Sequence, residues 1–257
     1  MNYNTDINII GSIPDYHLIY AALPLFDKGD SLFQTLVVDN EYNLRTEKSR
    51  KRFLSALNSA FITKNIDLND FVNVTLKHFE GDEKSQALIL FWVFSLNNRL
   101  FFDITKDVFL KYYYQGRAEL PKLDIEAYLK ELIYNNEELK GRWSIKTIET
   151  ISSKFLTVLK KLHLLEGSRK KSFCFVRVSD ELLTIFIHLY LFRDGRNHNL
   201  IEDDFSVFAF ISKEQLLERL KAIGQKDWIK MNYTGTTLRV ENVFNSKNII
   251  DGLFGRS

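Results

Sequence analysis

The chain has 257 residues, of which 45% are hydrophobic, 14% aromatic and 26% charged, and its formal net charge is +2. These proportions are typical of a folded globular protein and exclude an intrinsically disordered chain. The single cysteine, Cys174, excludes an internal disulfide and a four-cysteine zinc site, and it fits a reducing cytoplasm.

The first 120 residues predict a helical bundle. Its helices are expected where apolar side chains recur at helical spacing or form an apolar run: residues 46–61, 67–79, 82–96 and 100–114. Asp67 is expected to cap the second of them. Pro121 is the last proline of the chain, and we place the first domain boundary beside it, which gives a domain of residues 1–120.

Residues 121–195 predict a winged-helix-like unit. The expected elements are a short helix at 124–134, a long helix at 144–162, a basic turn at 167–172 and a strand at 173–178. Ser144 is the expected start of the long helix, whose apolar residues, Ile145 among them, fall on one face. A short helix, a long helix and a hairpin in this order are typical of a winged helix.

Residues 196–257 predict a second helix followed by a β-hairpin. Ser212 and Gln215 have the spacing of a capping box, and Gly224 closes the helix that they open. Residues 228–233 and 237–244 are the expected strands of the hairpin. The predicted fold class is therefore mainly α, with an N-terminal helical bundle followed by winged-helix units.

Common enzyme motifs are absent from the sequence. It has neither a glycine-rich phosphate loop nor a zinc-protease helix, and its five histidines are widely spaced. His188 lies in an apolar segment, where a core histidine is expected. We therefore expect a protein that is not an enzyme and that uses no metal or other cofactor.

Two apolar runs, residues 87–96 and 182–192, are shorter than the roughly 20 residues that a bilayer span requires. They are expected to be buried core helices. A cytoplasmic protein that does not interact with a membrane and dissolves without detergent is the expectation.

Positive charge is concentrated in one part of the chain. Residues 140–180 contain ten Lys or Arg against three Asp or Glu, although the chain as a whole is nearly neutral. Such a local excess is typical of a nucleic-acid-binding surface. The candidate DNA-binding residues lie in three clusters: Arg45, Lys48, Lys51 and Arg52; Lys146, Thr147, Thr150 and Lys154; and Arg169, Lys170 and Lys171.

Each cluster has a structural and a functional interpretation. A charged helix face is ordinarily a solvated surface. Cations at a helix N-terminus oppose the helix dipole, however, so the first cluster suggests phosphate contacts. Hydroxyls beside lysines, as in the second cluster, suit contacts in a major groove. The third cluster lies at the expected tip of the wing, from which cations can reach a flanking phosphate.

The sequence also resembles the BrxA family of BREX bacteriophage-exclusion systems. The resemblance extends from about Leu32 to Leu165 and is carried by three pieces in a fixed order. These are residues 98–114 with Asp107-Val108-Phe109, residues 124–129 (Asp-Ile-Glu-Ala-Tyr-Leu), and Trp143-Ser144-Ile145-Lys146-Thr147 followed by a leucine-rich helix end.

The resemblance implies a non-enzymatic, helical component of an antiviral system that binds double-stranded DNA. With the basic clusters, it predicts binding largely through phosphates and with little base specificity. Two alternatives remain open. The scaffold could be an adaptor that docks onto other BREX proteins, or the helical bundle could bind RNA.

Overall fold

The computed structural model describes residues 3–13, 16–28, 31–41, 43–194 and 199–243, together with residues 252 and 255. Most of these residues are helical, which confirms the prediction of a mainly α fold. The chain divides into two compact units, each made from two separate stretches: Met1–Thr63 with Val93–Phe175 (unit 1), and Lys64–Trp92 with Val176–Ser257 (unit 2). The boundaries expected at residues 120 and 195 each fall inside one of these units.

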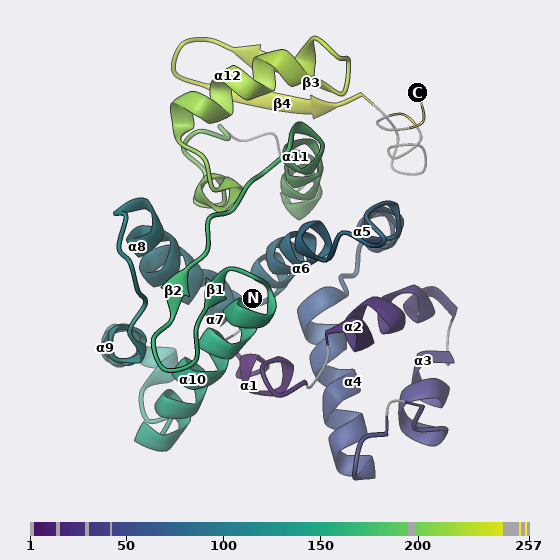
Figure 1. Ribbon diagram of the computed structural model, residues 1–257, viewed down its shortest axis with the longest axis vertical. Helices are drawn as coiled ribbons and strands as arrows, with labels where there is room; N and C mark the ends of the chain where they lie inside the picture. Colours follow the sequence, from purple (N-terminus) through teal and green to yellow (C-terminus); the bar gives the residue numbers. More distant parts are fainter. Residues whose placement is uncertain are drawn as a thin grey trace. The chain divides into compact units, whose positions relative to one another are not determined.

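Unit 1 is built from helices and one short hairpin. Its elements are α1 (Ile7–Ile10), α2 (His17–Ala22), the 3-10 helix η1 (Leu23–Lys28), α3 (Ser31–Phe33), the π-helix η2 (Gln34–Val38), α4 (Glu47–Phe61), α7 (Arg99–Ile104), the π-helix η3 (Thr105–Leu110), α8 (Lys111–Tyr114), α9 (Lys122–Asn135), the 3-10 helix η4 (Glu137–Leu139), α10 (Ile145–Lys161), β1 (Leu165–Glu166) and β2 (Ser172–Phe173). α1 packs against both α10 and α4 and lies between them (Figure 1).

Fully buried aromatic rings form the core of unit 1. Phe94 and Phe101 stack with their ring centroids 4.2 Å apart, and the Phe101 centroid lies 5.4 Å from that of Phe155 in α10. Burial of such rings supplies much of the stability of a core. The apolar face of α10 is thereby fixed against the bundle, and its opposite face is left toward solvent.

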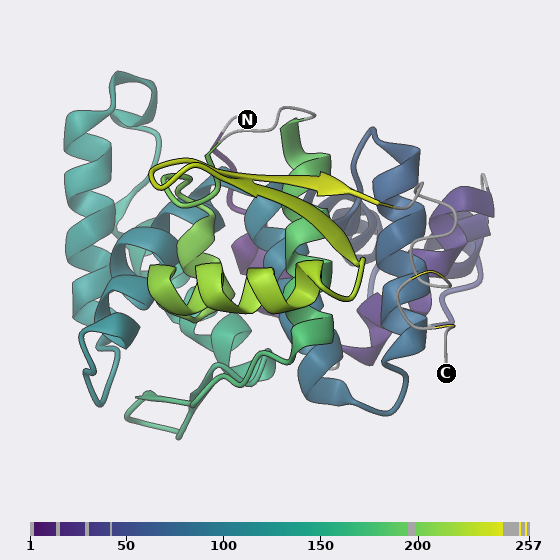
Figure 2. The same cartoon turned by 90° about the horizontal axis from the view of Figure 1, so that it is seen from above.

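Unit 2 combines helices with a second hairpin. Its elements are α5 (Ile66–His78), the first part of α6 (Glu83–Asn97), α11 (Asp180–Asp194), the 3-10 helix η5 (Ser206–Ala209), α12 (Lys213–Gly224), β3 (Ile229–Tyr233) and β4 (Leu238–Asn242). The last residues of α6 belong to unit 1. α12 packs along the antiparallel β3–β4 pair, as Figure 2 shows.

Unit 2 has its own aromatic core. Phe186 and Phe205 stack with their centroids 4.7 Å apart, and Trp92 lies 5.2 Å from Phe186. The buried indole N–H of Trp92 donates to the main-chain oxygen of Phe208 at 2.9 Å. His188 is fully buried in α11, as predicted, with its ring edge-on to Phe71.

Caps and hairpins with local sequence signals are confirmed. Ser144 accepts a hydrogen bond from the third residue of α10, as predicted, and Thr46, for which no cap was predicted, does the same for α4. Ser212 and Gln215 form a reciprocal capping box at α12. The predicted C-terminal hairpin is β3–β4, although the expected strand residue Phe244 lies outside the described residues.

Three local expectations were wrong. The N-cap of α5 is Asn65 and not Asp67. The side-chain oxygen of Asn65 accepts from the Leu68 N–H at 3.2 Å, so the helix begins two residues earlier than predicted. Ile145 is 71% exposed, because it is the first residue of α10 and precedes the turns that pack on the core. The strand expected at 173–178 ends at Phe173. The Cys174 N–H still donates to the Leu164 oxygen at 3.0 Å, and the chain leaves the hairpin there.

Among the described residues, no single helix is both long enough and apolar enough to span a membrane. α6 and the helical stretch from Arg99 to Tyr114 meet that test only when taken together, and they are bent by 113° at their junction. The two apolar runs lie in α6 and α11, where they are mostly buried.

An ion pair at the start of α11 predicts an acid-sensitive contribution to stability. Arg219 donates to Asp180 from Nη2 at 2.7 Å and from Nε at 3.1 Å, and this hydrogen bonding lowers the pKa of Asp180 below its usual 3.8. A lowered pKa in the folded state stabilises the fold above the usual pKa, and this contribution is lost as the pH falls.

We expect Asp180→Asn to lower the free energy of unfolding at pH 7 by about 0.5–1 kcal/mol, since the pair is partly exposed. Urea melts at pH 7 and below pH 3 test this. The difference between the variant and the parent should shrink at the lower pH, and a difference that is independent of pH would contradict it.

Candidate nucleic-acid interface

A short backbone segment ahead of α9 pairs with the hairpin that follows α10. The Leu120 N–H donates to the Lys171 oxygen at 2.8 Å, and the Phe173 N–H donates to the Ala118 oxygen at 3.3 Å. β1 and β2 are antiparallel, with Leu165 opposite Phe173. Residues 118–120, β2 and β1 therefore form one small sheet. Along the chain, α9 and α10 lie between residues 118–120 and the β1–β2 hairpin.

The outer face of α10 carries lysines and hydroxyls. Lys146, Ser153 and Lys160 are exposed on it, and the Lys146 side chain is 86% exposed. The Thr150 and Ser153 hydroxyls donate to the carbonyl oxygens four residues earlier, at 2.7 and 2.8 Å. Each hydroxyl oxygen keeps a lone pair that can accept a hydrogen bond from a ligand.

Two predicted residues of α10 have structural roles. Lys154 is half-buried, and both its Cβ and its main-chain oxygen lie against Gly11, which follows α1. The Thr147 N–H and hydroxyl both bond to the capping Ser144. Of the four residues predicted on this helix, Lys146 and Thr150 therefore remain on its outer face.

The three cations of the β1–β2 turn differ in their surroundings. Lys171 donates to the main-chain oxygens of Gly167 and Ser168, at 2.8 and 2.5 Å, and so closes the turn. Lys170 pairs with Glu119 at 3.2 Å but keeps 79% of its side chain exposed. Arg169 is exposed at the tip. Arg169 and Lys170 are thus the two cations that extend from the turn.

The charge of Lys160, near the end of α10, acts on Lys171 in the turn of the hairpin. Burial and the nearby charge of Lys160 both lower the pKa of Lys171. Two neighbouring ammonium groups repel each other, and a bound anion removes the repulsion. Lys160 connects the outer face of α10 with the basic turn, although it was not among the predicted site residues. The sequence carried a weak signal for it, because Lys160 lies on the polar arc of the long helix.

The first basic cluster lies on and just before α4. Lys51 pairs with Glu47 at 2.5 Å, one turn earlier on the helix. Arg45, Lys48 and Arg52 are exposed. The structure places α1 between α4 and α10 and so does not join this cluster to the other two (Figure 1).

Polar contacts behind α10 connect pieces that are far apart in the sequence. The Tyr128 hydroxyl of α9 donates to Asp107 of η3 at 2.8 Å. The Tyr3 hydroxyl donates to Asp103 at 2.7 Å, and its ring lies edge-on to Trp143, with centroids 6.5 Å apart. Burial and Asp103 raise the pKa of Tyr3 to about 12, so the phenol stays protonated. These contacts hold α9 and the start of α10 against the bundle.

Comparison with known proteins gives one family. The BrxA family model matches residues 22–187, a range that includes α4, α9, α10 and the β1–β2 hairpin. No curated protein and no solved structure matches the chain. The match confirms the resemblance drawn from residues 98–114, residues 124–129 and Trp143-Ser144-Ile145-Lys146-Thr147. Because the family model covers well over half of the sequence, the chain belongs to the BrxA family and is a component of BREX phage-defence systems.

Proposed function

We propose that this BrxA-family protein binds double-stranded DNA with α10 and the β1–β2 hairpin, which act as the recognition helix and the wing of a winged helix. Binding is largely through phosphates and has little base specificity. The role requires no catalytic residue and no cofactor, and it is carried out in the cytoplasm, where the other BREX proteins are possible partners.

The connection between residues 118–120 and β2 is the observation that supports this proposal most. In a winged helix, a strand is followed by two helices and then by a hairpin, and the second strand of the hairpin pairs with the initial strand. Residues 118–120, α9, α10 and the β1–β2 hairpin follow this order. In helix-turn-helix proteins the second helix enters the major groove, with its N-terminal residues toward the bases. Here that helix is α10.

The charges of this surface also favour a polyanion. Lys146 and Lys160 lie on the outer face of α10, and Arg169 and Lys170 extend from the wing. Phosphate contacts by such cations supply most of the affinity of DNA-binding proteins that lack sequence specificity. A surface of this kind is expected to bind any duplex about equally well.

One observation favours a second function, that of a protein–protein adaptor. Phe175, at the end of unit 1, is 87% exposed, and Ile145 is 71% exposed. Large apolar side chains at the surface are common in protein interfaces. In the adaptor reading, the same hairpin and helix would dock onto another BREX protein and would show no affinity for DNA.

Fluorescence anisotropy with labelled duplex DNA, single-stranded DNA and RNA of one sequence, each at two salt concentrations, tests the proposal. We expect the duplex to bind most tightly and its affinity to fall steeply with salt. A preference for RNA would instead support the helical bundle as an RNA-binding domain. The absence of binding to all three at low salt would contradict the proposal and favour the adaptor.

Gly167 is expected to be required for the geometry of the wing. Its φ is +89°, and a Cβ at this position would lie 2.2 Å from the Lys170 oxygen. Gly167→Ala should therefore displace Arg169 and Lys170 and weaken duplex binding severalfold, with little change in the melting temperature because the turn is exposed. Ser168→Ala, next to it, is the control and should bind as the parent does. Equal affinity of both variants would remove the wing from the interface.

A further inference from the structure

Two glutamates lie in one row across the small sheet of the wing. Glu119 is opposite Ser172 of β2, and Glu166 of β1 is opposite the same serine on its other side. Directly opposed residues of an antiparallel pair point to the same face of a sheet. Leu120 and Leu165, the neighbours of the two glutamates, are buried. Both carboxylates therefore point to the outer face of the sheet.

The two glutamates differ in their relation to the basic turn. The Glu119 carboxylate lies 3.2 Å from Nζ of Lys170, whose side chain is 79% exposed, and Glu119 itself is 37% exposed. Glu166 is exposed, and within the described part of the chain no ion pair joins it to a cation of the turn. One of the two cations that extend from the wing is thus already bound to a carboxylate.

A phosphate that binds Lys170 has to compete with this carboxylate. The backbone hydrogen bonds of residues 118 and 120 to the hairpin fix the chain on both sides of Glu119. The carboxylate therefore stays nearby when the Lys170 ammonium turns to a ligand. A phosphate oxygen in contact with Nζ would lie within about 6 Å of the carboxylate, where like charges repel.

We propose, on the basis of the DNA-binding function proposed above, that Glu119 limits the affinity of this surface. Its carboxylate occupies Lys170 in the free protein and is exchanged for a DNA phosphate on binding. The reduction in affinity is similar for every duplex, because a phosphate contact carries no base information. The carboxylate also favours release, since it remains beside Lys170 and can pair with it again.

Anisotropy titrations of Glu119→Gln with one labelled duplex test the role of this carboxylate. Glutamine keeps the size of the side chain and removes its charge. We expect the affinity to rise about threefold to tenfold, because an exposed ion pair no longer has to be broken and a repulsion is removed. The rate of dissociation should fall. Glu166→Gln, in the same row of the sheet, is the matched control and should raise the affinity by no more than about twofold, since solvent screens its charge.

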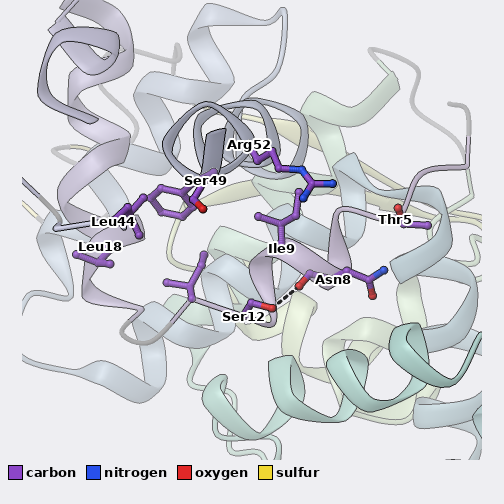
Figure 3. A pocket seen from close by; sticks show the side chains of 10 residues that line it. Thr5, Asn8, Ile9, Ser12, Leu18, Leu44, Ser49 and Arg52 are labelled. Carbon is purple, nitrogen blue, oxygen red and sulfur yellow. Dashed lines mark hydrogen bonds between the residues drawn. The ribbon is translucent and has the colours of Figure 1, made fainter. Parts of the chain in front are cut away.

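A double-mutant cycle identifies the group through which Glu119 acts. In a Lys170→Ala background, the gain from Glu119→Gln should shrink to that of the Glu166→Gln control. In an Arg52→Ala background, the full gain should persist. Arg52 of α4 lines a separate hollow with Asn8 and Ser12 of the N-terminal segment (Figure 3), and α1 lies between α4 and α10. Thermal melts establish that each variant is folded.

Three results would overturn this role of Glu119 while the parent still binds duplex DNA. They are a folded Glu119→Gln variant that binds no tighter than the parent, equal gains in Glu119→Gln and Glu166→Gln, which mean an effect of net charge only, and a gain that survives Lys170→Ala. If neither the parent nor Glu119→Gln binds any duplex at low salt, the proposed DNA-binding function is wrong and the role of Glu119 is wrong with it.

Discussion

Replacing Lys146, Lys160 and Arg169 together by alanine is expected to weaken duplex binding and to reduce its dependence on salt. Each cation that neutralises a phosphate releases counterions and contributes about 0.9 to the slope of log affinity against log salt. The slope of the triple variant should therefore be shallower by up to about 2.7. The loss should be similar for unrelated duplexes, because phosphate contacts carry no base information.

The three positions are chosen because the structure leaves them exposed. Lys171 is excluded because it closes the turn, and Lys154 because it packs against Gly11. The Lys146–Glu149 pair is exposed at 3.6 Å and contributes little to stability. The melting temperature of the triple variant should therefore match that of the parent.

A matched control has the same loss of charge in unit 2: Lys64, Lys77 and Lys84, all exposed, replaced by alanine. This control should keep most of the salt dependence of the parent. Titrations of both variants with one duplex, at several salt concentrations, give the comparison. A triple variant of α10 and the wing that keeps the parent's slope would contradict the proposed interface, and equal losses in both variants would reduce it to an effect of net charge.

Gly11→Ala is expected to give the largest loss of stability among the substitutions considered. A Cβ at this position would lie 2.8 Å from the main-chain oxygen of Lys154 and 3.0 Å from its Cβ. Two backbones meet there, and neither can turn away as a flexible side chain could. Overpacking of this kind typically costs about 1–3 kcal/mol.

The expected result is a decrease of about 2–3 kcal/mol in the free energy of unfolding, measured by urea denaturation. Gly224→Ala is the matched control, because the nearest atom to its added Cβ is 3.8 Å away. The control should be neutral or stabilising by up to about 1 kcal/mol, since alanine restricts the unfolded chain. If both alanine variants were equally stable, the close approach of α1 to α10 would not be a tight contact in solution.

Short-range signals in the sequence determined much of the secondary structure. Ser144 and the Ser212–Gln215 pair each precede an apolar period, and each caps a helix as predicted. The C-terminal hairpin was equally local, with strand-forming residues on either side of Gly235. Such signals are readable because a cap or a turn is formed within a few residues of the chain.

The division into units was not readable from the sequence. Unit 1 joins Met1–Thr63 with Val93–Phe175, and α6 passes from one unit into the other without a proline or a polar linker to mark the change. Pro121, the last proline of the chain, was the strongest local signal of a boundary, but it precedes α9 within unit 1. Compact units are defined by contacts between distant residues, which local composition does not encode.

The sequence by itself determined the helical character, the long amphipathic helix, the basic turn after it and the family. The tertiary structure alone decided which of the polar residues are available to a ligand. Gly11 covers one side of Lys154, whereas Lys160 on the same helix is left exposed. Helical periodicity predicts only the face of α10 on which a residue such as Lys154 lies. The residue that covers Lys154, Gly11, comes from a segment more than a hundred residues earlier in the chain.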